Sequence, residues 1–308
     1  MNRHDFREPP EMKIRDLFVR KTPTLSFEVF PPAREGNLES LYETIRELGD
    51  WKPDFISVTY GAGGSTRDKT IEIASKVKKD FHHEVLAHLT CVQSTRDDIA
   101  GILDALKNET IGNILALRGD PPDGTGAFRR VEGGFGYANE LVEFIRSRGD
   151  FCVGVAGYPE GHCEAPSLEV DIRNLKKKID AGADFIITQL FFDNDDFYRF
   201  RERSLKNGIR VPLIPGIFPI LNYKQSQRIG SLCAPKLPSA LREKIEKYRD
   251  KPEEIEKYGI EHAARQSEHL LRNEAAGIHI YSMNRSGPVR RILAELPFDP
   301  ARRKSKKD

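Results

Sequence analysis

The sequence predicts an α/β protein built as a closed (β/α)8 TIM barrel. Eight short apolar runs, each ending in a polar residue, alternate with segments of helical periodicity. A parallel strand pair needs a long crossover, and a helix is the usual crossover, so this alternation indicates a parallel sheet. In such a barrel, functional side chains gather at the C-terminal ends of the strands. The expected strands are 24–30, 54–61, 84–91, 113–120, 151–158, 184–192, 211–218 and 277–284.

The segments between the runs carry helix signals. Thr95 to Asp98 resembles a capping box, and Gly182 stands where a left-handed residue would end a fifth helix. After the first strand, apolar residues recur at helical spacing: Leu38, Leu41, Tyr42, Ile45 and Leu48.

Two stretches interrupt the alternation. The glycine-rich connection 121–136 is long for a compact domain, so we predict a lid over a ligand, with a tolerated insertion as the alternative. The stretch 233–274 holds extra helices before the last strand, one at 239–249 and one from Glu261. We place both on the barrel wall.

Length and charge favour one domain with no nucleic-acid role. Of the 308 residues we assign 24–298 to the barrel, 1–23 to an N-terminal extension and 299–308 to a basic tail. Lysine and arginine number 49 against 47 acidic residues, a net charge of +2, so no broad positive field would attract nucleic acid. The charged N-terminus does not resemble a secretory signal, and no apolar stretch could span a membrane. We expect a cytoplasmic protein.

The cysteines do not indicate a metal or disulfide framework. The four residues lie far apart with no Cys-x-x-Cys pair. We expect incidental thiols and no metal site.

Polar residues at the expected strand ends are the candidate site. Glu28 lies among large apolar residues, where loss of hydration favours a protonated carboxyl group and a general-acid role. The alternative is a glutamate paired with an arginine inside the barrel. Arg118, Gly119 and Asp120 join a cation, a residue that allows close main-chain approach, and an anion. A plain Arg118–Asp120 pair in a turn is the alternative there.

Other strand ends add further candidates. The glycine-rich turn 61–66 could cradle phosphate at a helix start, although any tight turn favours glycine. The remaining polar candidates each follow a different strand: His88, Tyr158, His162, Gln189 and Tyr281.

Six ordered motifs resemble the methylenetetrahydrofolate reductase family from about Thr24 to Leu296. They are Ser26-Phe27-Glu28-Val29-Phe30-Pro31-Pro32, Val58-Thr59-Tyr60-Gly61-Ala62-Gly63-Gly64-Ser65, Leu117-Arg118-Gly119-Asp120, Gly157-Tyr158-Pro159-Glu160-Gly161-His162, Ile187-Thr188-Gln189-Leu190-Phe191-Phe192-Asp193 and Pro215-Gly216-Ile217. Their order and spacing are similar to those of the bacterial single-domain enzyme. With few residues after Leu296, we expect the catalytic domain without the regulatory domain of the eukaryotic enzymes.

The resemblance implies an FAD enzyme that reduces 5,10-methylenetetrahydrofolate to 5-methyltetrahydrofolate with NADH or NADPH. It implies ping-pong hydride transfer through flavin N5, with Glu28 as general acid, Asp120 stabilising the folate cation and tuning the flavin, and Gln189 contacting folate and nicotinamide. We expect a homo-oligomer. The resemblance further implies folate or nucleotide contacts at Gln225 and Arg285, and FAD contacts at Thr59, Tyr60, Ala62, His88, Arg118, Gly119, Asp120, Ala138, Tyr158, His162, Ala165, Asp171, Asn174 and Lys178.

Three alternatives remain open from the sequence. A family variant could take electrons from a partner protein or a ferredoxin. A metal-dependent barrel lyase or hydrolase could use Glu28, His88, Asp120 and His162 as ligands, although no close ligand pair favours it. A non-catalytic flavin- or folate-binding module would be expected to lack the proton donor, whereas Glu28 is present.

Overall fold

Short parallel strands surrounded by helices form the fold. The computed structural model describes residues 12–20, 23–32, 38–60, 64–120, 128–229 and 235–296, with main chain only at 64–68. The predicted basic tail and residues 121–127 of the predicted lid lie outside these ranges. The strands are β1 (Thr24–Val29), β2 (Phe55–Val58), β3 (Val85–Thr90), β4 (Asn113–Leu117), β5 (Cys152–Gly157), β6 (Phe185–Thr188), β7 (Leu213–Ile214), β8 (Gly216–Ile217) and β9 (Gly277–Tyr281).

The sheet closes into a barrel through its seventh strand, which is interrupted and forms two short strands, β7 and β8. Its order is β7-β6-β5-β4-β3-β2-β1-β9-β8, all parallel. Only Pro215 separates the two outermost strands, β7 and β8, because proline has no N–H to donate to a ladder. The Pro215 main-chain oxygen still accepts a hydrogen bond of 3.0 Å from the His279 nitrogen. The predicted (β/α)8 TIM barrel is therefore confirmed.

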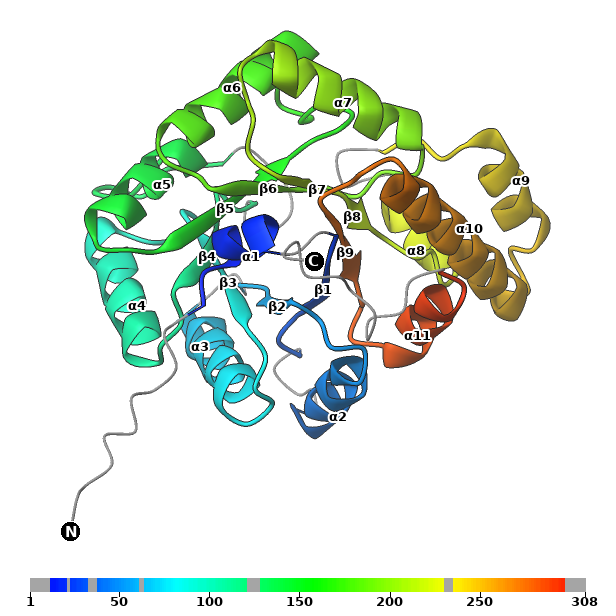
Figure 1. Ribbon diagram of the computed structural model, residues 1–308, viewed down its shortest axis with the longest axis horizontal. Helices are drawn as coiled ribbons and strands as arrows, with labels where there is room; N and C mark the ends of the chain where they lie inside the picture. Colours follow the sequence, from blue (N-terminus) through cyan, green and yellow to red (C-terminus); the bar gives the residue numbers. More distant parts are fainter. Residues whose placement is uncertain are drawn as a thin grey trace.

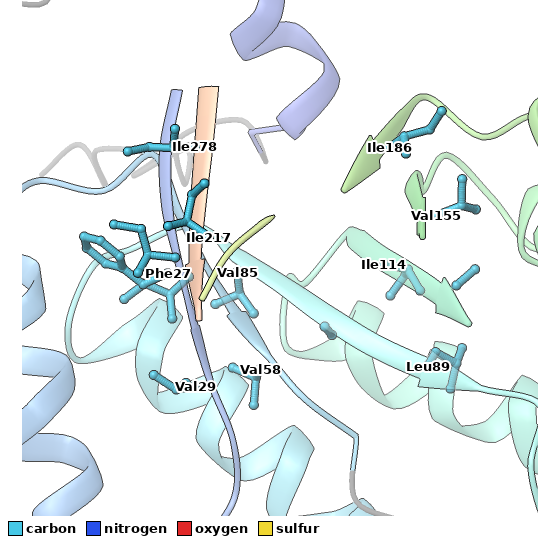
Figure 2. Close-up of a cluster of buried hydrophobic side chains, with 14 of the residues drawn as sticks. Phe27, Val29, Val58, Val85, Leu89, Ile114, Val155, Ile186, Ile217 and Ile278 are labelled. Carbon is cyan, nitrogen blue, oxygen red and sulfur yellow. The ribbon is translucent and has the colours of Figure 1, made fainter. Parts of the chain in front are cut away.

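Helices surround the strands, and all of them except α1 form a ring (Figure 1). They are α1 (Ile14–Arg20), α2 (Leu38–Gly49), α3 (Gly64–Lys79), α4 (Arg96–Asn108), α5 (Ala138–Ser147), α6 (Leu168–Asp180), α7 (Asn194–Lys206), α8 (Tyr223–Ile229), α9 (Ser239–Lys247), α10 (Pro252–Arg272) and α11 (Ser286–Ala294). Apolar strand residues that face these helices form the main core, and ten of them are labelled in Figure 2.

Local helix signals mostly agree with the structure. The Thr95 hydroxyl accepts from the Asp98 nitrogen, and the Asp98 carboxylate accepts from the Thr95 nitrogen, which confirms the capping box at the start of α4. Gly182 has φ of +113°, as expected for a left-handed terminator. The helix expected from Glu261 is wrong in its start, because α10 begins nine residues earlier at Pro252. Proline at the first helical position and two glutamates in the first turn favour that start.

Helix α1 closes the N-terminal end of the barrel and crosses the centre of the ring in Figure 1. Its Ile14, Leu17 and Phe18 pack on inward-facing strand residues, including Phe55 and Phe185. The ring centroids of Phe18 and Phe185 are 5.7 Å apart. We call this end of the barrel the floor, comprising α1, the inward residues that it contacts, and the network of Asn113 and Glu84. Part of the predicted N-terminal extension thus belongs to the barrel core.

Candidate active site

Inward-facing side chains become polar toward the C-terminal ends of the strands. On β3, Leu86 belongs to the apolar floor, while His88 and Thr90 follow it at every second position. On β1, Glu28 lies beside Ser57 of β2 and Tyr281 of β9 in the sheet register. We call this end the rim, comprising the polar inward-facing residues of the strands, such as His88 and Thr90, and the loops that follow the strands.

The Glu28 carboxyl group is largely buried between two imidazoles. Its side chain is 19% exposed, and its Oε2 lies 3.5 Å from His88 Nε2 and 3.8 Å from His279 Nε2. Within the described part of the chain, no arginine pairs with Glu28. The neighbours of Glu28 are therefore histidines rather than the arginine of the alternative interpretation.

His88 leaves an unused polar atom facing this carboxyl group. Burial lowers the pKa of His88 to about 4, against a smaller opposing effect of Glu28, so the imidazole is uncharged at neutral pH. Its buried Nε2 has no hydrogen-bond partner among the described residues, and the same is true of Thr90 Oγ1. Such orphaned groups are costly inside a protein, and a bound ligand is one explanation for them.

His279 is a rim residue that the sequence reasoning missed. It is fully buried, its Nδ1 lies 2.8 Å from Ser26 Oγ, and its Nε2 lies 3.4 Å from Ser57 Oγ. Its ring stacks on Phe55 at 6.1 Å, which joins the rim to the floor. Strand alternation could have found it, because His279 precedes the chosen Tyr281 by two positions.

Tyr281 on β9 and Gln189 after β6 lie on either side of the interrupted seventh strand, β7 and β8. The Tyr281 hydroxyl donates to the Thr188 main-chain oxygen at 2.9 Å, and burial raises its pKa well above the usual value, so it stays protonated. Gln189 follows β6, and its Oε1 accepts from the Leu190 nitrogen at 2.9 Å. Its amide NH2 group is the part left for a ligand, since the side-chain oxygen is already bonded.

The predicted turn after β4 has a backbone geometry that favours glycine at position 119. Gly119 has φ of +84°, and a Cβ there would lie 2.9 Å from Val92 Cγ1. Arg118 does not pair with Asp120 as the alternative proposed. Its guanidinium instead grips the Glu164 carboxylate in a fork, with Nη1–Oε2 at 2.5 Å and Nη2–Oε1 at 2.7 Å. The Asp120 side chain is exposed.

A cationic group lies between β5 and α6. Lys178 Nζ donates to the Ala156 main-chain oxygen at 2.6 Å, and burial lowers the pKa of Lys178 to about 8 despite nearby Asp171. Burial raises the pKa of Asp171 and lowers that of His162. The His162 ring packs edge-on against Tyr158 at 4.6 Å. Together with Arg118, these side chains could hold an anion such as a diphosphate.

The other predicted residues have simpler surroundings. Thr59 and Tyr60 follow β2, Ala138 begins α5, and the Ala165 nitrogen donates to the His162 oxygen at 2.9 Å. Asn174 lies on the exposed side of α6. Ala62 and the turn 61–63 lie outside the described residues.

Gln225 lies in α8, which follows β8, and Arg285 lies in the segment that follows β9. Gln225 Oε1 accepts from the Leu221 nitrogen at 2.6 Å. Arg285 precedes α11 and pairs with Glu256 of α10 at 3.1 Å. The structure does not bring Arg285 into contact with Glu28.

The described ranges contain no group of three or more His, Cys, Asp or Glu side chains arranged to hold a metal ion. None of their helices combines the length and apolar character needed to cross a bilayer.

Fold and site together define a (β/α)8-barrel protein with a cluster of titratable and cationic side chains at its rim. The chain belongs to the methylenetetrahydrofolate reductase family, whose family model matches residues 13–297. It is 41% identical to methylenetetrahydrofolate reductase (NADH) 1 of Arabidopsis thaliana, over 92% of this chain and 50% of that protein. It is 37% identical to 5,10-methylenetetrahydrofolate reductase of Escherichia coli, over 85% of this chain and 86% of that protein.

The chain thus spans about half the length of the plant relatives. A structural comparison adds support for the fold. A Clostridium thermocellum protein, described as binding two copies of 5-methyl-5,6,7,8-tetrahydrofolic acid, aligns with a TM-score of 0.58 at 14% identity. The alignment covers 91% of this chain and 96% of that one.

Proposed function

We propose that this protein reduces 5,10-methylenetetrahydrofolate to 5-methyltetrahydrofolate with NADH or NADPH, using bound FAD. Family membership supports the reaction, and the names of the plant relatives favour NADH. The observation that carries the proposal is the largely buried Glu28 carboxyl group beside an uncharged imidazole at the rim of the barrel. That is the position at which the sequence resemblance puts the general acid.

The rim residues fit FAD on two grounds. His88 Nε2 and Thr90 Oγ1 are buried polar atoms without hydrogen-bond partners among the described residues. Arg118, His162 and Lys178 supply cationic or hydrogen-bonding groups for a diphosphate. Bound FAD would carry hydride from the nicotinamide to the folate, with the two substrates using the site in turn.

Glu28 would supply the proton that the folate reaction requires. The five-membered ring of the substrate opens only when its leaving nitrogen gains a proton, which leaves a positive charge on the folate. Because His88 is uncharged at neutral pH, it does not hold Glu28 in a salt link. The carboxyl group is therefore not fixed by a charged partner there, and it would deliver the proton to the leaving nitrogen.

Asp120 and Gln189 have supporting roles in the proposal. The Asp120 carboxylate would stabilise the positive charge that develops on the folate. Gln189 would orient folate and nicotinamide through its amide NH2 group, since its oxygen is already bonded to Leu190.

An anaerobic colour cycle tests the proposed function. Purified protein loaded with FAD should be yellow, lose its colour with NADH or NADPH, and regain it when 5,10-methylenetetrahydrofolate is added, with 5-methyltetrahydrofolate formed in equal amount. Protein that does not take up FAD, or whose bleached flavin is not reoxidised by the folate, would contradict it. Rapid mixing with each nucleotide in turn identifies the donor, and failure of both would favour a partner protein.

A further inference from the structure

The Glu164 carboxylate is bonded to the Arg118 guanidinium, the group that the proposed function assigns to the cofactor. We call this two-bond ion pair the fork. Arg118 follows β4, and Glu164 lies 46 residues later in the loop between β5 and α6. A carboxylate and a phosphate present the same pair of acceptor oxygens to a guanidinium, so both can fill the same fork. The carboxylate therefore stands where a phosphate oxygen pair could bind.

The two partners of the fork differ in how firmly they are fixed. The Arg118 side chain is 17% exposed, and its guanidinium lies over the Phe128 ring at 5.0 Å. Its Nε also donates to the Gly119 main-chain oxygen at 3.4 Å. The Glu164 side chain is 51% exposed, and Arg118 is its hydrogen-bonding partner. Glu164 can thus turn into water at little cost, whereas Arg118 stays in place.

We propose that Glu164 is an intramolecular competitor for Arg118 that a phosphate group of the bound cofactor displaces. This inference rests on the proposed function, because that function names a diphosphate cofactor. Glu164 satisfies the Arg118 guanidinium in the cofactor-free protein and weakens cofactor binding by the free energy of the fork. It regulates cofactor affinity and has no part in the chemistry.

Charge effects on the same loop agree with an exchange of anions. Glu164 raises the pKa of Arg118, and Arg118 lowers the pKa of Glu164, so both groups are fully charged at neutral pH. The Glu164 nitrogen donates to His162 Nδ1 at 3.1 Å, which ties the exchange to a second residue assigned to the cofactor.

FAD affinity of the cofactor-free protein is the test, measured by flavin fluorescence at low ionic strength. Glu164→Gln should lower the dissociation constant for FAD about two- to fivefold, the range expected for a partly exposed ion pair. Riboflavin, which has no phosphate, should bind equally to both proteins. Glu169→Gln removes a nearby charge that does not contact Arg118 and should leave FAD affinity unchanged.

A double-mutant cycle shows whether the effect passes through Arg118. In an Arg118→Met background, Glu164→Gln should no longer change FAD affinity. The inference is overturned if Glu164→Gln weakens FAD binding or leaves it unchanged, or if the gain persists without Arg118. Failure of the wild-type protein to bind FAD would instead remove the proposed function, and the inference with it.

Discussion

The floor and the rim are opposite ends of the same strands and treat their polar groups in opposite ways. At the floor, buried Asn113 is fully engaged: its Oδ1 accepts from the Ile14 nitrogen, and its Nδ2 donates to Glu84 Oε1 and the Met12 oxygen. Lys78 in turn pairs with Glu84 at 2.6 Å. At the rim, His88 Nε2 lies near the Glu28 carboxyl group but has no hydrogen-bond partner among the described residues. Satisfied groups stabilise a fold, while unsatisfied ones are kept where a ligand completes them.

The largest expected effect separates rim chemistry from folding. Glu28→Gln keeps the shape of the side chain but removes the transferable proton. It should slow flavin reoxidation by methylenetetrahydrofolate about 10²- to 10⁴-fold while flavin reduction by the nicotinamide continues nearly unchanged. Stopped-flow absorbance measures both rates. The exposed variant Glu43→Gln on α2 serves as the control, and equal survival of both rates would remove Glu28 as proton donor.

Acid should destabilise the FAD-free protein through His88. Its pKa is about 4 in the folded protein, against an ordinary value of 6.5 for histidine, so between these pH values the unfolded chain binds the extra proton. The stability is present above pH 6.5 and lost as pH falls toward 4, by about 3 kcal/mol in total. Glu28 opposes this effect and His279 adds to it. Urea unfolding at pH 7 and 4.5 should show a smaller loss in His88→Gln, and equal losses would mean that the pKa of His88 does not differ between the folded and unfolded states.

Breaking the floor network should reduce stability without changing cofactor affinity. Asn113→Ala leaves Glu84 and the Ile14 nitrogen without their buried partner and should cost about 2 kcal/mol of unfolding free energy. Chemical denaturation measures this cost, and Asn108→Ala at the exposed end of α4 should stay within about 0.5 kcal/mol of wild type. Unchanged stability in Asn113→Ala would deny the floor its structural role.

The smallest effect concerns Lys178 and pH. Burial holds the pKa of Lys178 at about 8, so the ammonium loses its charge above that pH and its attraction for phosphate with it. FAD affinity of the wild-type protein should fall by up to about tenfold per pH unit above 8. Lys178→Arg should hold its affinity to higher pH, because arginine stays charged. Lys177→Arg, an exposed neighbour, should behave like wild type, and a Lys178→Arg profile that also follows wild type would exclude Lys178 as the phosphate partner.

The sequence predicted the parts of the fold that local patterns encode. Buried strands appear as apolar runs, and the Thr95 capping box marks a helix start, so strand positions and barrel class followed directly. The closure of the N-terminal end of the barrel by α1 could not be predicted from a local pattern, because Ile14, Leu17 and Phe18 form one short apolar stripe in a charged segment. The break at Pro215 was hidden inside one apolar run.

The placement of candidate site residues was predictable where a local sequence pattern fixes it. The positions of Glu28 on a strand and of Gly119 in the turn after β4 followed from their neighbours in sequence. Glu164 was missed because its partner, Arg118, lies 46 residues away, and nothing local distinguishes it from other exposed glutamates. His279 was missed although strand alternation points it inward beside Tyr281.

The most direct test of the comparison is the rate at which methylenetetrahydrofolate reoxidises the reduced flavin in Glu28→Gln and Asn113→Ala, measured side by side at a temperature where both are folded. We predict that the rim variant loses this rate and keeps its unfolding free energy, while the floor variant keeps the rate and loses stability. If Asn113→Ala slows flavin reoxidation as much as Glu28→Gln does, the claim that the rim carries the chemistry and the floor carries stability is wrong.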